Sequence, residues 1–441
     1  YGDHRDLHLS IRRQRQMCIR DRSKEINTYM NRLGSEAKEA SLILAQASLE
    51  QKNEALSCMS EQIESDRDEI LSINKKDLDL AKQKSIGSAL IDRLELNDSR
   101  INSMISGLQV VSELPDPVGE ITDLDPTPSG IEVSKMRVPL GVVGIIYESR
   151  PNVTADAAAL CLKSGNACLL RGGSEAILSN KIIWNCLQEG LKKASLPKEC
   201  IQLVETTDRE AVKTLLHLDD YLDVVIPRGG KGLVQLISDE SKVPVIKHLD
   251  GICHVYIDEA ADIKKAENIA FNAKTYRYGI CGAMETLLVH SSVASLLIPS
   301  LEERFSSEGV EVRGCQKTLQ VINAIEAKED DWLTEYLAPI LSIKVVEDMS
   351  EAIDHIQKYG SQHTDSIVTE DKNKAEYFFK NVDSSSVMHN LPTCWADGFE
   401  YGLGAEVGIS TDKIHARGPV GLEGLTSQKF IVKGNSNLRG V

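Results

Sequence analysis

The chain has 441 residues, of which 41% are hydrophobic, 26% charged and 5% aromatic, and its net charge is −16. This length predicts two or three domains, and the composition excludes a disordered chain and a small disulfide scaffold. An acidic chain without a dense basic stripe is a poor candidate for binding nucleic acid or an anionic membrane surface.

Targeting and metal-binding patterns are also missing from the sequence. No apolar run approaches the roughly 18 residues of a membrane span, and no signal peptide opens the chain, so a cytoplasmic protein is expected. The ten cysteines include no Cys-x-x-Cys pair, and the ten histidines lack the spacing of metal ligands. The sequence therefore predicts no metal site.

Residues 1–22 differ from the rest of the chain, since they hold six Arg, three Asp and no Lys. The stretch Met17-Cys18-Ile19-Arg20-Asp21 is what read-through of a sequencing adapter would encode. We interpret residues 1–22 as a non-native segment, with a disordered basic tail as the alternative, and exclude them from the fold prediction.

Residues 23–112 show helical periodicity, with apolar residues about 3.6 positions apart. Ser48 and Gln51 have the spacing of a capping box. Four prolines between 115 and 128 predict a loop, and the alternation over 131–138 predicts a strand in a hairpin.

From residue 141 onward, short apolar runs alternate with helical segments, which indicates parallel sheets covered on both faces. The predicted strands are 141–147, 167–170, 201–204, 224–227, 243–246, 254–257, 285–290, 341–346, 366–368 and 429–433. The predicted helices are 156–163, 176–193, 263–273, 294–306 and 351–359.

The most specific local feature is the segment 272–281, which ends in Cys281 shortly before a predicted strand. Lys274 and Arg277 are close in sequence, and a nearby positive charge favours thiolate over thiol. A buried structural cysteine is the alternative reading of this segment taken alone. The chain lacks G-x-G-x-x-G and the Walker phosphate loop, so a nicotinamide cofactor would bind in another way.

Several long motifs then occur in a fixed order. They are 138–154 (VPLGVVGIIYESRPNVT), 170–176 (LRGGSEA), 226–233 (IPRGGKGL), 272–281 (NAKTYRYGIC), and 402–406 with 409–419 (GLGAE, ISTDKIHARGP). The sequence from about residue 23 to its end resembles the gamma-glutamyl phosphate reductases, a branch of the aldehyde dehydrogenase superfamily. The resemblance implies NADPH-dependent reduction of L-glutamyl 5-phosphate to L-glutamate 5-semialdehyde and phosphate, the second step of proline synthesis from glutamate.

The resemblance also implies roles for individual residues. Cys281 would attack the acyl phosphate and form a thioester. Asn152 would donate its amide to the tetrahedral oxyanion. Where hydrolytic aldehyde dehydrogenases carry a Glu that activates water, this chain has His248, which is expected to be structural or to lie beside the substrate.

Cofactor and substrate residues follow from the same motifs. Arg171 could pair with the 2′-phosphate of NADPH. Relatives that prefer NAD often have Glu near the position of Ser174, and its replacement by Ser removes the repulsion of that phosphate, which favours NADPH. Glu335 matches a residue that holds the nicotinamide ribose in relatives, and Gly229 and Gly230 are expected at the cofactor. The substrate anions could be bound by Arg150, Arg277 and Arg417.

Two departures from the family pattern stand out. Gly282 replaces the usual Asn after the nucleophile, and 390–395 reads Asn-Leu-Pro-Thr-Cys-Trp where the family commonly reads Asn-Ala-Ser-Thr-Arg-Phe. The second change loses an Arg near the expected cofactor–substrate cleft, which puts substrate affinity in doubt more than the reaction type.

The expected fold is aldehyde dehydrogenase-like α/β, with two doubly wound domains and a small β unit. Residues 23–127, 144–252 and 388–416 would form the cofactor domain, 253–387 the catalytic domain, and 128–143 with 417–441 an oligomerisation unit. A homodimer or tetramer is expected, and glutamate 5-kinase is a candidate partner because the acyl phosphate is labile. A hydrolytic NAD-dependent aldehyde dehydrogenase and a non-catalytic paralogue remain the alternatives.

Overall fold

The computed structural model describes residues 3–439, apart from the side chains of residues 3–21, 88 and 89. The chain divides into two compact units, which we call unit 1 (Tyr1–Ile246 with Gly421–Val441) and unit 2 (Lys247–Val420). Residues 388–416 group with unit 2, and not with the first unit as expected, because β13 (Ser386–His389) pairs with β12 (Thr364–Val368). The assignment of cofactor binding to one unit and catalysis to the other stays a prediction.

Unit 1 opens with five helices, in agreement with the helical periodicity of the sequence. Ser48 and Gln51 form the predicted capping box, with hydrogen bonds of 3.3 and 3.2 Å. Residues 3–22 belong to the first helix, and their non-native origin stays a prediction. In the part of the chain that is described, no helix is long and apolar enough to cross a membrane. The helices are α1 (Asp3–Leu44), α2 (Leu49–Ser65), α3 (Arg67–Gln83), α4 (Ser88–Leu94) and α5 (Asp98–Glu113).

A four-stranded parallel sheet in the order β5-β4-β3-β6 forms the centre of unit 1. Alternate residues of its strands point to opposite faces. Val142, Ile146 and Leu169 pack with α1, α8 and α9 on one face, and the Tyr147 hydroxyl contacts Thr154 of α6 on the other, at 2.7 Å. The elements are β3 (Val142–Tyr147), α6 (Asn152–Lys163), β4 (Ala167–Gly172), α7 (Ile177–Lys193), β5 (Ile201–Leu203), α8 (Arg209–Leu215), β6 (Val224–Arg228) and α9 (Lys231–Glu240).

The predicted strand 243–246 is reduced to a single bridge between Val225 and Val245. The carbonyl of Pro244 accepts a hydrogen bond from the Val225 N–H at 2.8 Å. Because proline has no N–H, it cannot donate the hydrogen bond that would extend this pairing. The prediction of a four-residue strand over 243–246 is therefore wrong, since only one bridge forms.

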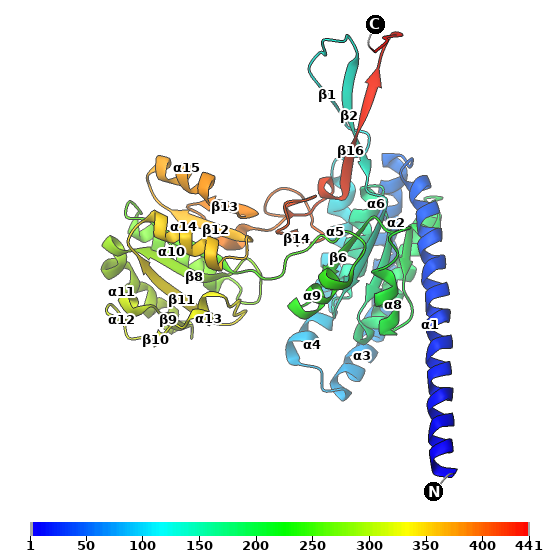
Figure 1. The fold of residues 1–441 in the computed structure, drawn as a ribbon, viewed down its shortest axis with the longest axis horizontal. Coiled ribbons are helices and arrows are strands. Elements are labelled where there is room, and N and C mark those ends of the chain that lie inside the picture. The colour runs from blue at the N-terminus through cyan, green and yellow to red at the C-terminus, as the bar shows by residue number, and fades with distance from the viewer. Residues whose placement is uncertain (1–2, 440–441) are drawn as a thin grey trace. The chain divides into compact units, whose positions relative to one another are not determined.

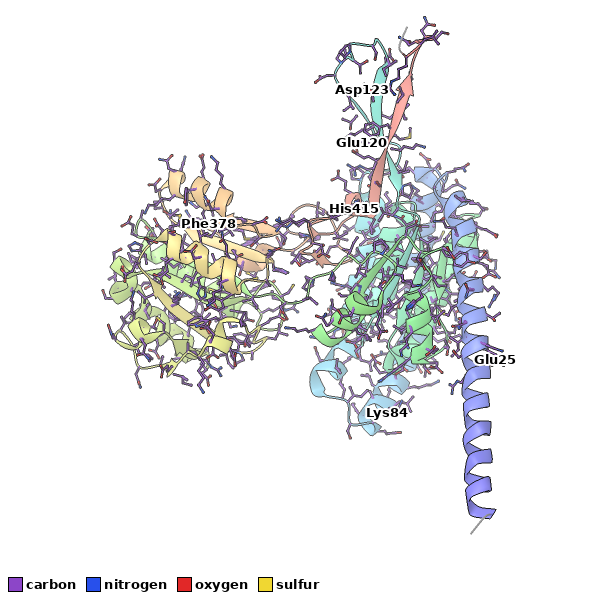
Figure 2. All side chains as sticks on the ribbon, in the orientation of Figure 1. Glu25, Lys84, Glu120, Asp123, Phe378 and His415 are labelled. Carbon is purple, nitrogen blue, oxygen red and sulfur yellow. The ribbon has the colours of Figure 1, made fainter. Side chains whose placement is uncertain are left out.

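An antiparallel ribbon extends the same unit (Figure 1). It consists of β1 (Ile121–Asp123), β2 (Glu132–Pro139) and β16 (Thr426–Lys433), and β2 pairs with β16 along its whole length. Glu120 and Asp123 lie on this ribbon (Figure 2). The predicted strands 131–138 and 429–433 correspond to β2 and β16, and the role of this ribbon in oligomerisation stays a prediction.

Unit 2 contains a seven-stranded parallel sheet in the order β10-β9-β11-β8-β7-β12-β13. Val255, Leu287 and Ile343 pack under α10 and α11, whereas Tyr256, Leu288 and Ile367 pack under α14 and α15. Phe378 of α15 stacks on Tyr256 with ring centroids 6.4 Å apart (Figure 2). Both sheets are thus covered on both faces, which confirms the predicted doubly wound α/β fold.

Seven elements of unit 2 have bounds close to those predicted, namely β7, β8, β11, β12, α10, α11 and α14, whereas the others were not predicted. The strands are β7 (Cys253–Ile257), β8 (Met284–His290), β9 (Glu311–Gly314), β10 (Ile325–Glu326), β11 (Ile340–Val346), β14 (Ile409–Ser410) and β15 (Gly418–Pro419), besides β12 and β13. The helices are α10 (Ile263–Thr275), α11 (Ser291–Ser307), α12 (Gln316–Leu319), α13 (Glu329–Trp332), α14 (Met349–Tyr359) and α15 (Lys372–Asn381).

Candidate active site

The segments that precede four adjacent parallel strands of unit 2 meet at one edge of its sheet. Cys281 comes just before β8, and Gly251 and His248 come before β7. His363 directly precedes β12, and Glu335 precedes β11. Because parallel strands begin at the same edge, residues far apart in sequence lie together here. The amino edge of the unit 2 sheet is therefore the candidate active site.

Gly251 lies directly against the backbone of Cys281. A Cβ atom on Gly251 would stand 2.1 Å from the Cys281 carbonyl oxygen and 2.6 Å from its Cα. The Gly251 N–H donates to Glu335 Oε1 at 2.9 Å, and the Cys253 thiol donates to the Cys281 carbonyl at 3.1 Å. These contacts fix the position of the half-buried Cys281.

We expect Gly251→Ala to lower kcat about 10²-fold, since a displacement of about 1 Å at a reacting group can cost this much. The added methyl cannot be accommodated unless backbone moves, because the atoms that it meets belong to the main chain of Cys281. Steady-state kinetics of purified protein would measure the effect. Gly279→Ala is the matched control, since it lies in the same loop with no atom within 4 Å of its Cβ position. Equal kcat values for the two variants would contradict the prediction.

A second group at this edge consists of His248, Cys281 and His363. One side-chain nitrogen or sulfur atom of each lies within 4.8 Å of the others, and the two imidazole rings meet edge-on with centroids 5.4 Å apart. His248 Nδ1 is 3.0 Å from the Ile409 carbonyl. Burial, reinforced by the neighbouring His248, lowers the pKa of His363 to about 3, so this imidazole is neutral near pH 7. His363 therefore cannot keep a proton taken from Cys281.

The sequence analysis did not predict a role for His363. Its position directly before the strand 364–368 is the one signal that could have indicated it. His248, predicted to be structural or substrate-adjacent, does lie beside Cys281.

Lys274 does not supply an uncompensated positive charge to Cys281, contrary to the expectation from sequence. Its ammonium lies 2.5 Å from Glu285 Oε2, and both side chains are buried. Glu285 Oε1 also accepts the Leu337 N–H at 3.2 Å. Burial raises the pKa of Glu285 and lowers the pKa of Lys274, and the contact between them opposes both shifts. We interpret the pair as a structural ion pair that links the segments before and after Cys281.

The three predicted anion-binding arginines have different surroundings. Arg277 is exposed, and among the described residues it has no ion-pair partner. Arg417 donates to Asp383 Oδ1 at 2.6 Å and to the Asp383 carbonyl at 2.7 Å. Arg150 belongs to unit 1, where it precedes α6. All three assignments stay predictions.

The two departures from the family motifs contact each other. A Cβ on Gly282 would lie 3.2 Å from the Thr393 carbonyl and 3.4 Å from Cys394 Cα. The segment with the inserted Pro392 thus passes close to the residue after Cys281, where a larger side chain such as Asn would have to displace backbone. The two departures therefore lie next to each other in the structure.

Four of the five predicted cofactor residues, Arg171, Ser174, Gly229 and Gly230, lie at the carboxyl edge of the unit 1 sheet, where ligands bind in open α/β folds, whereas Glu335 belongs to unit 2. Arg171 lies near the end of β4 and Ser174 follows it, Gly229 and Gly230 follow β6, and the predicted oxyanion donor Asn152 follows β3. Burial lowers the pKa of the Arg171 guanidinium, whose Nε has no hydrogen-bond partner. Gly230 is the N-cap of α9, its N–H donates to Glu148 Oε2 at 3.1 Å, and its Cβ position is open.

The predicted oxyanion donor, Asn152, begins α6 and donates from Nδ2 to Asp156 Oδ2 at 2.8 Å. Burial raises the pKa of Asp156 to about 6. An amide nitrogen has two hydrogens, so the second remains for a ligand. Asn152 belongs to unit 1 and Cys281 to unit 2, and their cooperation stays a prediction.

Comparison with known proteins places the chain in a family. The sequence model of the aldehyde dehydrogenase family matches residues 15–316. The chain is similar to a gamma-glutamyl phosphate reductase from Thermotoga maritima, with 44% identity, 93% of this chain and 99% of that chain covered, and a TM-score of 0.91. A gamma-glutamyl phosphate reductase from Saccharomyces cerevisiae is 32% identical, with 93% and 98% covered and a TM-score of 0.52.

A more distant structure shows the fold alone. An acetylating aldehyde dehydrogenase from Geobacillus thermoglucosidasius is 18% identical, with 96% of this chain and 100% of that chain covered and a TM-score of 0.67. The identities above 30%, spread over nearly the whole length of both reductases, extend the resemblance seen in the motifs. The chain belongs to the aldehyde dehydrogenase family and, within it, to the gamma-glutamyl phosphate reductases.

Proposed function

We propose that this chain catalyses the NADPH-dependent reduction of L-glutamyl 5-phosphate to L-glutamate 5-semialdehyde and phosphate, the second step of proline biosynthesis from glutamate. The observation that carries the proposal is Cys281, which the backbone contact with Gly251 holds at the sheet edge in a chain 44% identical to a gamma-glutamyl phosphate reductase. The wider description as an oxidoreductase of the aldehyde dehydrogenase type rests on the family membership itself.

Cys281 is the proposed nucleophile. Its thiolate sulfur forms a bond to the acyl carbon, and phosphate leaves with the electron pair of the broken C–O bond, so that a thioester remains on the enzyme. The Cys281 N–H and the second amide hydrogen of Asn152 are the proposed donors to the tetrahedral oxyanion. The chemistry that NADPH supplies when bound is hydride donation to the acyl carbon, after which the thiolate is the leaving group.

The surroundings of Cys281 support reduction over hydrolysis. The side chains clustered with its sulfur are the imidazoles of His248 and His363. A hydrolytic enzyme needs a base to activate water, and His363, whose pKa is lowered to about 3, is too weak a base near neutral pH. A thioester that water does not attack persists long enough to be reduced.

The residues at the carboxyl edge of the unit 1 sheet fit an anionic dinucleotide. Arg171 has a buried Nε without a partner, which a 2′-phosphate could satisfy, and exposed Ser174 adds no negative charge. Gly229 and Gly230 directly precede α9, and a phosphate bound at their backbone would have to replace the Glu148 carboxylate that accepts the Gly230 N–H. Glu335 is the proposed contact to the nicotinamide ribose. Together these residues support NADPH as the cofactor.

We also propose a homo-oligomer, a dimer or tetramer, built through the β1-β2-β16 ribbon. Three apolar side chains on this ribbon are exposed, Phe430 at 65%, Val432 at 58% and Ile121 at 55%. An exposed apolar strand edge invites pairing with a second subunit. A cytoplasmic location and delivery of the labile acyl phosphate by glutamate 5-kinase complete the proposal.

The dependence of the reverse reaction on phosphate tests this function. With glutamate 5-semialdehyde and NADP⁺, we expect continuous NADPH formation only when phosphate or arsenate is present, because the thioester must be cleaved by that anion. Without the anion, the reaction should stop after about one NADPH per Cys281. The absorbance of NADPH measures both phases. Continuous turnover without phosphate would instead support a hydrolytic aldehyde dehydrogenase.

A further inference from the structure

We propose that His248, Cys281 and His363 form a binding site for Zn²⁺, and that zinc bound there reversibly blocks the nucleophile. The binding is inferred from this cluster alone, whereas the inhibition rests on the proposed function of Cys281. The sequence predicted no metal site, since the three residues come from segments before three different strands, β7, β8 and β12.

The geometry of the cluster suits a tetrahedral metal. One potential ligand atom from each residue lies within 4.8 Å of the other two. Ligands of a tetrahedral zinc are roughly 3.5 Å apart, as bonds of about 2.0–2.3 Å require. The three side chains therefore need to close by about 1 Å or a little more, which rotation about side-chain torsions can supply. The fourth position stays open, as in zinc sites with three protein ligands.

An independent observation points to a ligand at this place. The His363 side chain is fully buried, and its Nε2 has no hydrogen-bond partner in the described part of the chain. Its other nitrogen, Nδ1, lies 2.9 Å from Thr364 Oγ1 and 3.6 Å from Cys253 Sγ. A buried ring nitrogen left without a partner costs free energy, and coordination of a metal would satisfy it.

The second imidazole is oriented as zinc-bound imidazoles usually are. His248 Nδ1 is 3.0 Å from the Ile409 carbonyl, and a backbone carbonyl at one ring nitrogen fixes the ring and its tautomer. Two neutral imidazoles and one thiolate favour Zn²⁺ or Co²⁺ over Mg²⁺ or Ca²⁺, which prefer oxygen ligands. Formation of the Zn–S bond releases the Cys281 thiol proton to solvent, and no electron is transferred.

The consequence concerns the reaction. A sulfur bonded to zinc carries less negative charge and is shielded by the metal and its other ligands, so its attack on the acyl phosphate is blocked. Removal of zinc by a chelator restores the thiol without chemical change. We therefore expect zinc inhibition that EDTA reverses and that competes with the acyl substrate.

Cobalt is the probe that tests binding apart from activity. Metal-free full-length protein is titrated with Co²⁺ at constant pH, and a near-ultraviolet thiolate-to-cobalt charge-transfer band reports the Co–S bond. We expect the band in the wild type and its loss in Cys281→Ser. In His363→Asn and His248→Asn, which keep a polar atom near Nδ1 and remove Nε2, the dissociation constant should rise by about 10–100-fold. Cys315→Ser, at a thiol of unit 2 outside the cluster, is the matched control and should bind like the wild type.

A measurement on the wild type covers the case in which a variant fails to fold. Zinc should slow alkylation of Cys281 by iodoacetamide, as peptide mapping would show, and leave alkylation of Cys315 unchanged. Absence of a charge-transfer band, or a band that persists in Cys281→Ser, would overturn the proposal. An affinity unchanged in both histidine variants would overturn it as well. If the protein binds cobalt as expected but has no reductase activity, only the proposed function fails.

Discussion

Replacement of Cys281 by serine is expected to lower the reductase rate by at least about 10³-fold, as removal of a nucleophile does in other covalent enzymes. A serine hydroxyl is not ionised near neutral pH, and the structure places no strong base beside it, since the neighbouring His363 has a pKa lowered to about 3. Oxidation of NADPH in the presence of L-glutamyl 5-phosphate, or its formation in the reverse reaction, measures the effect.

The matched control for this variant is Cys315→Ser. Cys315 is half-buried in the same unit, and its sulfur accepts a hydrogen bond from the Val345 N–H at 3.4 Å. Hydrogen bonds to the sulfur lower the pKa of Cys315 although burial opposes them, so it is a second thiol that alkylating reagents should reach. We expect Cys315→Ser to keep wild-type activity. Full activity of Cys281→Ser would show that the assignment of the nucleophile is wrong. An equal loss of activity in Cys281→Ser and Cys315→Ser would contradict it as well.

Labelling separates a reactive Cys281 from a structural one. Burial raises the pKa of Cys253 and of Cys200, so these thiols should resist iodoacetamide near neutral pH. In Cys315→Ser, the label should appear mainly on the peptide that contains Cys281. A Cys281 as slow as the buried thiols would support a non-catalytic paralogue.

The second large effect concerns the buried ion pair of Lys274 and Glu285. Lys274→Met is expected to lower the free energy of unfolding by about 3–5 kcal/mol, because it leaves a buried carboxylate without its counter-charge. The side chains of Lys274 and Glu285 are 0% and 1% exposed, so water cannot replace the lost partner. The midpoint of urea unfolding measures the change.

The double variant Lys274→Met/Glu285→Gln is the control for this experiment. Glutamine retains an oxygen that can accept the Leu337 N–H, as Glu285 does at 3.2 Å, but it carries no charge. We expect the double variant to be more stable than the single one. A double variant that is less stable than Lys274→Met would contradict the role of the unpaired charge.

The pH dependence of Lys274→Met follows from the same carboxyl group. Burial already raises the pKa of Glu285 to about 7 from 4.5, and loss of the ammonium raises it further. The pKa of Glu285 in the folded protein is higher than in the unfolded chain. The contribution of this group to the free energy of unfolding is therefore complete below about pH 4.5 and is lost as the pH rises through the folded-state pKa. The deficit of the variant relative to wild type should therefore be smaller at pH 5 than at pH 8.

Local patterns of the sequence determined much of the fold. Apolar runs such as 141–147 and 167–170 correspond to β3 and β4, because a strand buried on both faces needs a continuous apolar run. Ser48 and Gln51 determined a capping box by their spacing alone. The motif around Cys281 identified the family, since a long string of residues in fixed order carries more information than composition, and the role of Cys281 as the nucleophile stays a prediction.

Tertiary structure decided what stands around the nucleophile. Gly251 is 30 positions from Cys281 and 84 from Glu335, and His363 is 115 positions from His248, yet the order β11-β8-β7-β12 brings their segments to one edge. Lys274 illustrates the same limit, since its sequence neighbour Cys281 suggested an activating charge, whereas folding gave that charge to Glu285. Sequence spacing predicts interactions within one helix or strand. In a parallel sheet, long crossover connections separate neighbouring strands in the sequence, so the contacts at the starts of these strands cannot be found from spacing.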